Sequence, residues 1–133
     1  MTPALLQALR DRVAEVRIEA AYALLKLRQE TETGWKVLTE ELNNHWGGPR
    51  AEAALKLAEL GSQASNAVVP LMKLLDDRLD QVRASAAQAL GRIGASAAVA
   101  IPDLRKACRD PEFHVRKAAT LALQRIESAK STF

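Results

Sequence analysis

Residues 82–94 read VRASAAQALGRIG, and this stretch decides the fold. Its apolar residues recur every three or four positions, which places them on one face of a helix. Versions of the stretch occur four times, and their arginines lie 33 residues apart at Arg17, Arg50, Arg83 and Arg116. A repeat period of this length indicates a protein built from stacked units.

The columns around each arginine repeat as well. An alanine stands three residues after it, a leucine seven after it, and a leucine or isoleucine ten after it. Another leucine stands twelve residues before it, and position six before is Asp11, Asn44, Asp77 or Asp110. Each unit therefore reads as a first helix, A, a short turn and a second helix, B. One such pair is too small to bury its apolar face alone, so neighbouring pairs must stack.

The whole chain is consistent with one domain of this kind. Its 133 residues are 48% hydrophobic, which suits a single compact domain. We predict four helical hairpins, with repeats covering about residues 1–33, 34–66, 67–99 and 100–133. No apolar run is long enough to span a bilayer, and the N-terminus lacks the pattern of a secretory signal. The predicted location is the cytoplasm.

The second repeat is the least regular. Residues 43–49 read NNHWGGP, so Asn44 replaces the aspartate and Pro49 replaces the valine that precedes the arginine elsewhere. We expect the two glycines to free the backbone and to shorten the start of the second B helix. Trp46 is interpreted as filling the gap that the glycines leave, and a contact with a partner is the alternative.

The two ends of the chain also depart from the pattern. Terminal repeats of stacked-repeat proteins usually have a polar outer face. Here the first A helix carries Leu5 and Leu6, and the last B helix carries Leu121, Leu123 and Ile126. Exposed apolar ends predict self-association through the terminal repeats, or stacking with further repeats if the chain is a fragment of a longer array. Residues 128–133 are predicted to be a frayed tail.

The sequence offers few candidates for catalysis or metal binding. His45 and His114 have no partner at ligand spacing. Cys108 shares its column with three leucines, which favours a buried, inert thiol. No metal motif, phosphate-binding glycine loop or nucleophile–base pair is present. We therefore predict no enzymatic activity, no cofactor and no metal site.

Residues 77–94 resemble the HEAT-like repeats named after phycobilisome lyases. The residues that carry the resemblance are Asp77, Val82, Arg83, Ala86, Ala87, Ala89, Leu90, Gly91, Ile93 and Gly94. Residues 110–126 match the pattern well, residues 11–27 match without the glycines, and residues 44–61 match more weakly. The resemblance implies an all-α, right-handed α-α superhelix (solenoid) of four HEAT-like hairpins, with the B helices lining a concave surface. It also implies that the motif aspartate and arginine form a ladder between repeats, so the four arginines are predicted to be structural.

The B-helix positions that the core columns leave free are the candidates for binding. They lie one, two, five and nine residues after each arginine, and they vary while their neighbours repeat. The predicted partner-binding residues are Ile18, Glu19, Tyr22, Lys26, Glu52, Leu55, Glu59, Gln88, Arg92, Lys117, Leu121 and Arg125. An apolar row with charged margins is typical of a surface that binds a protein or peptide. An ordinary solvated surface is the alternative.

These observations predict a non-catalytic protein-interaction or scaffold module that binds a protein or peptide on the concave face of its B helices. A nucleic-acid-binding HEAT-like protein and a bilin lyase subunit are the alternatives. Residues 67–133 carry 11 basic and 7 acidic side chains, a net charge of +4, which favours an acidic partner or nucleic acid. Nucleic acid is disfavoured by Glu19, Glu52 and Glu59, and bilin chemistry by the lack of a suitably placed cysteine or histidine.

Overall fold

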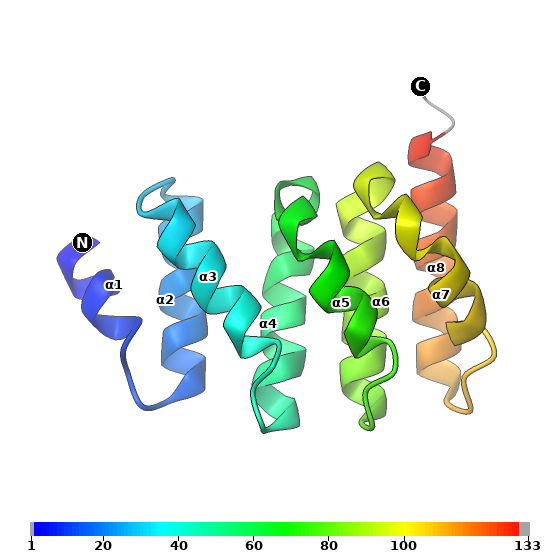
Figure 1. Ribbon diagram of the computed structural model, residues 1–133, viewed down its shortest axis with the longest axis horizontal. Helices are drawn as coiled ribbons and strands as arrows, with labels where there is room; N and C mark the ends of the chain where they lie inside the picture. The colour runs from blue at the N-terminus through cyan, green and yellow to red at the C-terminus, as the bar shows by residue number, and fades with distance from the viewer. Residues whose placement is uncertain (1, 131–133) are drawn as a thin grey trace.

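The computed structural model describes residues 2–130, which form four helical hairpins stacked side by side (Figure 1). The A helices are α1 (Thr2–Ala8), α3 (Thr31–Glu41), α5 (Val68–Leu74) and α7 (Ile101–Ala107). The B helices are α2 (Ala14–Lys26), α4 (Gly47–Leu60), α6 (Asp80–Ile93) and α8 (Phe113–Lys130). Two 3₁₀ segments, η1 (Gly61–Ala67) and η2 (Gly94–Ala100), precede α5 and α7.

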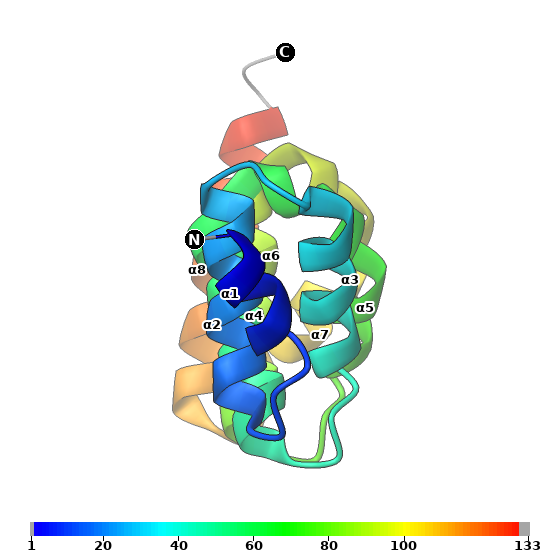
Figure 2. The ribbon, with the colours of Figure 1, turned by 90° about the vertical axis from the view of Figure 1, so that its left-hand side faces the viewer.

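The hairpins build two layers. Seen from the end, α3, α5 and α7 lie on one side and the B helices on the other (Figure 2). The prediction of an all-α, right-handed solenoid of HEAT-like hairpins is confirmed for the described part of the chain. Within that part, no helix combines the length and the apolar character that crossing a bilayer requires.

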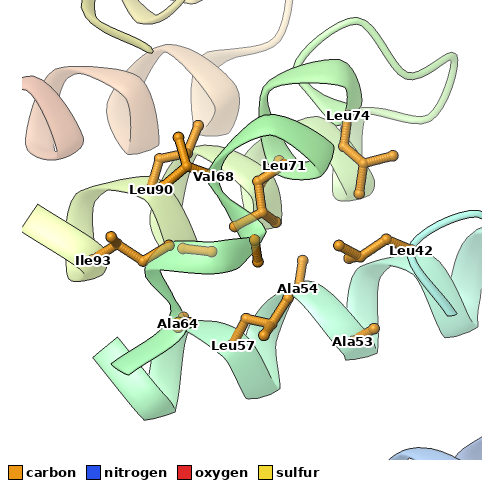
Figure 3. Packing of buried hydrophobic residues seen from close by; sticks show 14 of the residues in the cluster. Leu42, Ala53, Ala54, Leu57, Ala64, Val68, Leu71, Leu74, Leu90 and Ile93 are labelled. Carbon is orange, nitrogen blue, oxygen red and sulfur yellow. The ribbon is translucent and has the colours of Figure 1, made fainter. Parts of the chain in front are cut away.

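The leucine columns of the sequence form the core between the layers. Six of these leucines have no exposed surface, namely Leu24, Leu38, Leu57, Leu71, Leu90 and Leu104. Figure 3 shows how side chains of α4, α5 and α6 fill the space between these helices. Truncating a leucine that is buried in this way costs about 2–5 kcal/mol, because the lost contacts leave a cavity. Stacking of these apolar faces is therefore the main source of stability.

The start of α4 differs from the prediction. The two glycines lie inside the helix, and Gly47 begins α4 at the position where Asp80 begins α6, 33 residues later. The expectation that the glycines shorten this helix is wrong. A Cβ atom at position 47 would collide with the side chain of Leu79, so the glycine makes room for the next repeat.

The last helix is also longer than predicted, because α8 continues to Lys130. Residues 131–133 of the predicted tail lie outside the described part.

The four repeated arginines hold the turns between A and B helices. In each repeat, Nη1 of the arginine donates to the backbone carbonyl oxygens six and five residues earlier, at 2.7–3.3 Å. Three of the arginines also reach the following repeat, two of them through the motif aspartate. Arg50 Nε donates to Asp77 Oδ2 at 2.8 Å, and Arg83 Nε donates to Asp110 Oδ2 at 2.7 Å. A second guanidinium nitrogen binds the other carboxylate oxygen in both pairs, so the contacts are bidentate. The ladder that the resemblance implied is therefore confirmed.

The aspartates of the ladder also shape the turns. Oδ1 of Asp77 accepts the N–H of Leu79, and Oδ1 of Asp110 accepts the N–H of Glu112, both at 2.9 Å. Burial by itself opposes ionisation of these carboxyl groups. The hydrogen bonds from the arginine and the backbone N–H, together with the arginine charge, nevertheless hold the pKa of both carboxyl groups below the usual 3.8.

The first rung of the ladder uses a different carboxylate. Asn44 occupies the aspartate position, and Arg17 Nε instead donates to Glu41 Oε1 at 2.7 Å. Asn44 Nδ2 donates to the second oxygen of Glu41 at 2.9 Å. The hydrogen bond with Glu41 raises the pKa of the Arg17 guanidinium. Glu41 stands in a column with Ala8, Leu74 and Ala107, and this break in an apolar column was the available sequence signal.

The two ends of the solenoid are unlike each other. Of the apolar residues predicted at the C-terminal end, Ile126 is fully buried, Leu123 is half-buried and Leu121 is 45% exposed. The polar residues Lys117, Thr120 and Gln124 of the same helix are exposed, so this end is only partly apolar. The N-terminal end instead has a shallow, largely apolar hollow. Its lining is Leu5, Ala8, Glu15, Val16, Glu19, Ala20 and Ala23. Self-association through the N-terminal end stays a prediction.

Substitution of Asp110 by asparagine tests the ladder. We expect Asp110→Asn to lower the free energy of unfolding by about 2–4 kcal/mol, because it leaves the mostly buried Arg83 guanidinium without its carboxylate. Chemical denaturation followed by circular dichroism measures this value. The control is Glu127→Gln, which removes a solvent-exposed ion pair with Arg105 and should cost less than about 0.5 kcal/mol. Equal losses in the two variants would show that the ladder contributes no more than a surface pair.

Acidification tests the same carboxyl groups. The pKa of Asp77 and Asp110 is lower in the folded chain than the usual 3.8 expected after unfolding. Their ionised forms therefore stabilise the fold above about pH 4, and this contribution is lost as the pH falls through the folded pKa. We expect the Tm of the native chain to fall below that pH, and that of the Asp77→Asn/Asp110→Asn variant to fall less. Thermal unfolding across the acid range is the measurement, and parallel curves for the two proteins would contradict the assignment.

Candidate functional site

The predicted binding residues lie on the B face, which we define as the exposed surface of α2, α4, α6 and α8. Eleven of the twelve are accessible in the structure. The exposed ones are Glu19, Lys26, Leu55, Glu59, Gln88, Arg92, Lys117, Leu121 and Arg125, and the half-buried ones are Tyr22 and Glu52. The structure divides them into two groups of different character, one between α2 and α4 and the other between α6 and α8.

Ile18 was wrongly assigned to this surface, because none of its surface is exposed. Residues one and eight positions after each arginine lie two helical turns apart on the same side of the B helix. At position eight of α6, Gly91 packs directly against Ala122 of α8. This side therefore faces the next B helix, and in α2 it carries Ile18 and Leu25, which are both buried. Ile18 belongs to the core between repeats.

A network of paired groups covers the junction between α2 and α4. We call it the α2–α4 cluster, and it consists of Glu19, Tyr22, Lys56 and Glu59. Lys56 Nζ lies 3.0 Å from Glu19 Oε1 and 4.8 Å from the centroid of the Tyr22 ring. The hydrogen bond with Glu19 raises the pKa of Lys56. Burial, followed by the hydrogen bond with Glu59, raises the pKa of the Tyr22 hydroxyl. The Lys56 ammonium and the Tyr22 hydroxyl therefore stay protonated at neutral pH. Within the cluster, the charge of Lys56 is balanced by Glu19 and lies close to the Tyr22 ring.

Lys56 is a surface residue that the sequence analysis missed. It stands six positions after Arg50, where the other repeats have Ala23, Ala89 and Ala122. A lysine in a column of alanines was the signal that could have found it. Figure 1 shows α2 farther from α4 than α4 is from α6, which agrees with larger side chains at this junction.

The junction between α6 and α8 is open. A groove of about 300 Å³ lies there, which we call the α6–α8 groove. Five predicted binding residues line it, namely Gln88, Arg92, Lys117, Leu121 and Arg125, together with His114 and the small residues Gly91, Ala118 and Ala122. Within residues 2–130, the three cations Arg92, Lys117 and Arg125 take part in none of the ion pairs. The groove therefore combines an apolar floor with unpaired positive charge at its margins.

The small residues of the floor are required by the close approach of two helices. A Cβ atom at Gly91 would lie 2.7 Å from the Cα and 2.9 Å from the Cβ of Ala122, which is closer than van der Waals contact permits. The backbones of α6 and α8 therefore touch at this point. The long, exposed side chains of Arg92 and Arg125 line the same groove.

His114 at the edge of the groove has partners that the sequence analysis did not find. Its Nε2 lies 2.7 Å from Asp80 Oδ2. The nearest ligand atoms of Asp80, Glu112 and His114 lie within 4.8 Å of one another, a spacing that could hold a metal ion. Asp80 and His114 come from successive hairpins, so a search for ligand spacing within one hairpin could not bring them together. The contact between His114 and Asp80 accounts for the closeness of two of these three accessible side chains without a metal.

Two further residues differ from their interpretations. Trp46 does not fill a gap, because 69% of its surface is exposed. Its ring meets the ring of His45 edge-on, with centroids 4.9 Å apart. The alternative, that Trp46 contacts a partner, stays a prediction. Cys108 is half-buried rather than fully buried, and its Sγ lies 3.7 Å from Thr120 Oγ1.

Comparison with known families agrees with this architecture. The sequence matches a family model described as HEAT repeats over residues 68–132, and one described as PBS lyase HEAT-like repeat over residues 49–77. Together these models identify HEAT-like repeats over residues 49–132. None of the curated protein sequences with which it was compared matches it.

Several solved structures have the same fold. A designed armadillo repeat protein in complex with peptide (KR)4 superposes with a TM-score of 0.74 at 25% identity, covering 94% of this chain and 63% of that one. An engineered protein solved by crystallography has a TM-score of 0.71 at 29% identity, with coverage of 96% and 63%. Human deoxyhypusine hydroxylase in complex with glycerol has a TM-score of 0.74 at 28% identity, with coverage of 96% and 44%. This chain thus spans less than two thirds of each of these proteins.

Two glycine-to-alanine variants test the close contact of α6 and α8 beneath the groove. We expect Gly91→Ala to lower the free energy of unfolding by about 1–3 kcal/mol, because the added methyl group pushes α8 away. The matched control is Gly48→Ala, since a Cβ there meets nothing within 4 Å, and this change should be neutral or slightly stabilising. Urea denaturation of the two variants checks the difference. A neutral Gly91→Ala variant would contradict the close helix contact.

Proposed function

We propose that this chain is a non-catalytic interaction module that binds a segment of another protein on its B face. The observation that carries the proposal is the α6–α8 groove, where five residues predicted to bind a partner line one open, largely apolar depression. A surface of this kind, with an apolar centre and a charged margin, is typical of protein–protein interfaces. The residues of the repeated motif build the scaffold, and the variable residues on the B helices supply the contacts.

The apolar side chains of the B face form a row that supports this proposal. Tyr22, Leu55 and Leu121 occupy the same position in their helices, five residues after the repeated arginine. Leu55 is 40% exposed and Leu121 is 45% exposed. A bound segment that runs along the solenoid would cover this row, one repeat after another. The peptide complex of the designed armadillo protein, which has a similar fold, lends support to peptide binding here.

The alternatives have less support. A basic stripe for nucleic acid would need the repeated arginines, but the turns and the ladder occupy all four. Nucleic-acid binding would also place phosphates against Glu52 and Glu59, at an electrostatic cost. A bilin lyase needs groups that handle a tetrapyrrole, and His114 on the B face is already paired with Asp80.

Two matched double variants test the proposed surface. The first, Leu55→Asp/Leu121→Asp, changes exposed residues of the B face, and we call it the B-face variant. The second, Val69→Asp/Val99→Asp, changes residues of α5 and η2 that are 61% and 62% exposed, and we call it the A-layer variant. We expect both variants to fold, since all four side chains are accessible. Affinity capture from a cell extract should yield a partner with the native chain and with the A-layer variant, but not with the B-face variant. Loss of the same partner only in the A-layer variant would move the binding site to the opposite side.

A further inference from the structure

We infer that the α6–α8 groove binds an acidic, amphipathic peptide segment, with an apolar side chain on its floor and carboxylates against its cations. The inference rests on the proposed function and adds to it the chemistry of the partner. It follows from three properties of the groove: unpaired positive charge, an apolar floor, and a position at the basic end of an electrostatically divided surface.

The positive charges of the groove lack partners within the described chain. Some exposed cations, such as Arg105 and Lys106, have a nearby carboxylate, at 3.6 and 3.9 Å respectively. Others, such as Lys36 and Lys73, stand apart from one another without an ion pair in the described chain. Arg92, Lys117 and Arg125 also have none, but all three line the same depression. Like charges that converge on one site repel each other, and an anionic ligand relieves this repulsion. Arginine also binds carboxylates in bidentate geometry, which adds specificity.

The floor of the groove selects for more than charge. Gly91, Ala118 and Ala122 put no large side chain on the floor above the helix contact, and Leu121 supplies an exposed apolar side chain. A groove of about 300 Å³ is at the low end of the volumes that enclose small ligands, and it suits one or two large apolar side chains. A leucine or phenylalanine of the partner would bury apolar surface here, which favours binding. A purely polar polyanion gains nothing from this floor.

The rest of the B face gives the bound segment a direction. At the other end, Lys56 already neutralises Glu19, whereas Glu52 and Glu59 remain accessible to solvent. An acidic segment over α4 would meet these carboxylates, whereas the lining of the α6–α8 groove contains three cations, His114 and no carboxylate. Asp80 lies outside this lining, beside His114. The acidic part of the partner is therefore placed over the last two repeats. A nucleic acid, which carries its charge uniformly, fits this divided surface less well.

Three labelled peptides of equal length test the inference. They carry leucine at the same positions and have glutamate, glutamine or lysine at all the others. We expect fluorescence anisotropy to show binding of the glutamate peptide, weaker binding of the glutamine peptide, and no binding of the lysine peptide. Raising the salt concentration should weaken the first interaction. A glutamate peptide whose leucines are replaced by glutamine should also bind more weakly, because the floor then stays uncovered.

Charge variants locate the site. Arg92→Glu/Arg125→Glu should weaken binding of the glutamate peptide by about tenfold or more, and Arg92→Gln/Arg125→Gln should weaken it less. The control is Lys36→Glu/Lys73→Glu, which makes the same change in net charge at exposed positions of α3 and α5. This control should leave the affinity unchanged at moderate salt. Circular dichroism of each variant shows that it is folded.

The outcomes separate this inference from the proposed function. If the lysine or glutamine peptide binds more tightly than the glutamate peptide, and Leu121→Asp abolishes that binding, the partner segment is not acidic. The proposed binding surface would remain supported in that case. If Arg92→Glu/Arg125→Glu and Lys36→Glu/Lys73→Glu weaken binding equally, net charge alone drives binding, and the α6–α8 groove is not the binding site. Tight binding of a short RNA of the same charge in place of the glutamate peptide would overturn the inference as well. If no peptide binds, the inference fails, and the capture experiment still decides the proposed function.

Discussion

A guanidinium group that binds two successive turns at once keeps the hairpins in register. Arg50 and Arg83 each hold two carbonyl oxygens of their own turn and both carboxylate oxygens of the next. Only arginine has enough donors in a planar arrangement to do this, and a lysine would leave acceptors unsatisfied. The leucines between the layers supply most of the stabilisation, while the ladder determines how one unit sits on the next. At the first junction, Glu41 replaces the missing aspartate and keeps the contact with Arg17. The arginine therefore needs a carboxylate at this place, but the carboxylate need not come from the same position of the repeat.

Given this register, the size of a few side chains decides what each junction between B helices can do. At the junction of α6 and α8, a glycine lies against an alanine, and the helices touch. The long side chains of Arg92 and Arg125 line the groove there and find no carboxylate within the described chain. Between α2 and α4, larger residues separate the helices, and Lys56 fills the space with its charge paired to Glu19. One scaffold thus carries a closed junction and an open groove on the same face.

This division makes the proposed binding surface uneven along the solenoid. A uniform row of apolar residues would suit any amphipathic segment. Here the accessible carboxylates Glu52 and Glu59 lie on the second repeat, and three unpaired cations line one groove on the last two repeats, so we expect charge complementarity to select both the partner and its orientation. In this proposal, exposed apolar residues such as Leu55 and Leu121 supply contact area, and the charged residues supply selectivity. Because the repeated motif is satisfied internally, these variable positions can change without loss of the fold.

The period of 33 residues, visible in the sequence, was sufficient to predict the hairpins and the core leucines, and the family resemblance implied the structural role of the arginines. Helical spacing also identified five of the nine residues that line the α6–α8 groove. Only the tertiary structure could show which flank of that exposed face the next repeat covers. It placed Ile18 in the core, Lys56 at the surface and Asp80 beside His114. The physical reason is that these outcomes depend on the distance between neighbouring B helices, which is set by pairs of side chains from different repeats and not by the pattern within one.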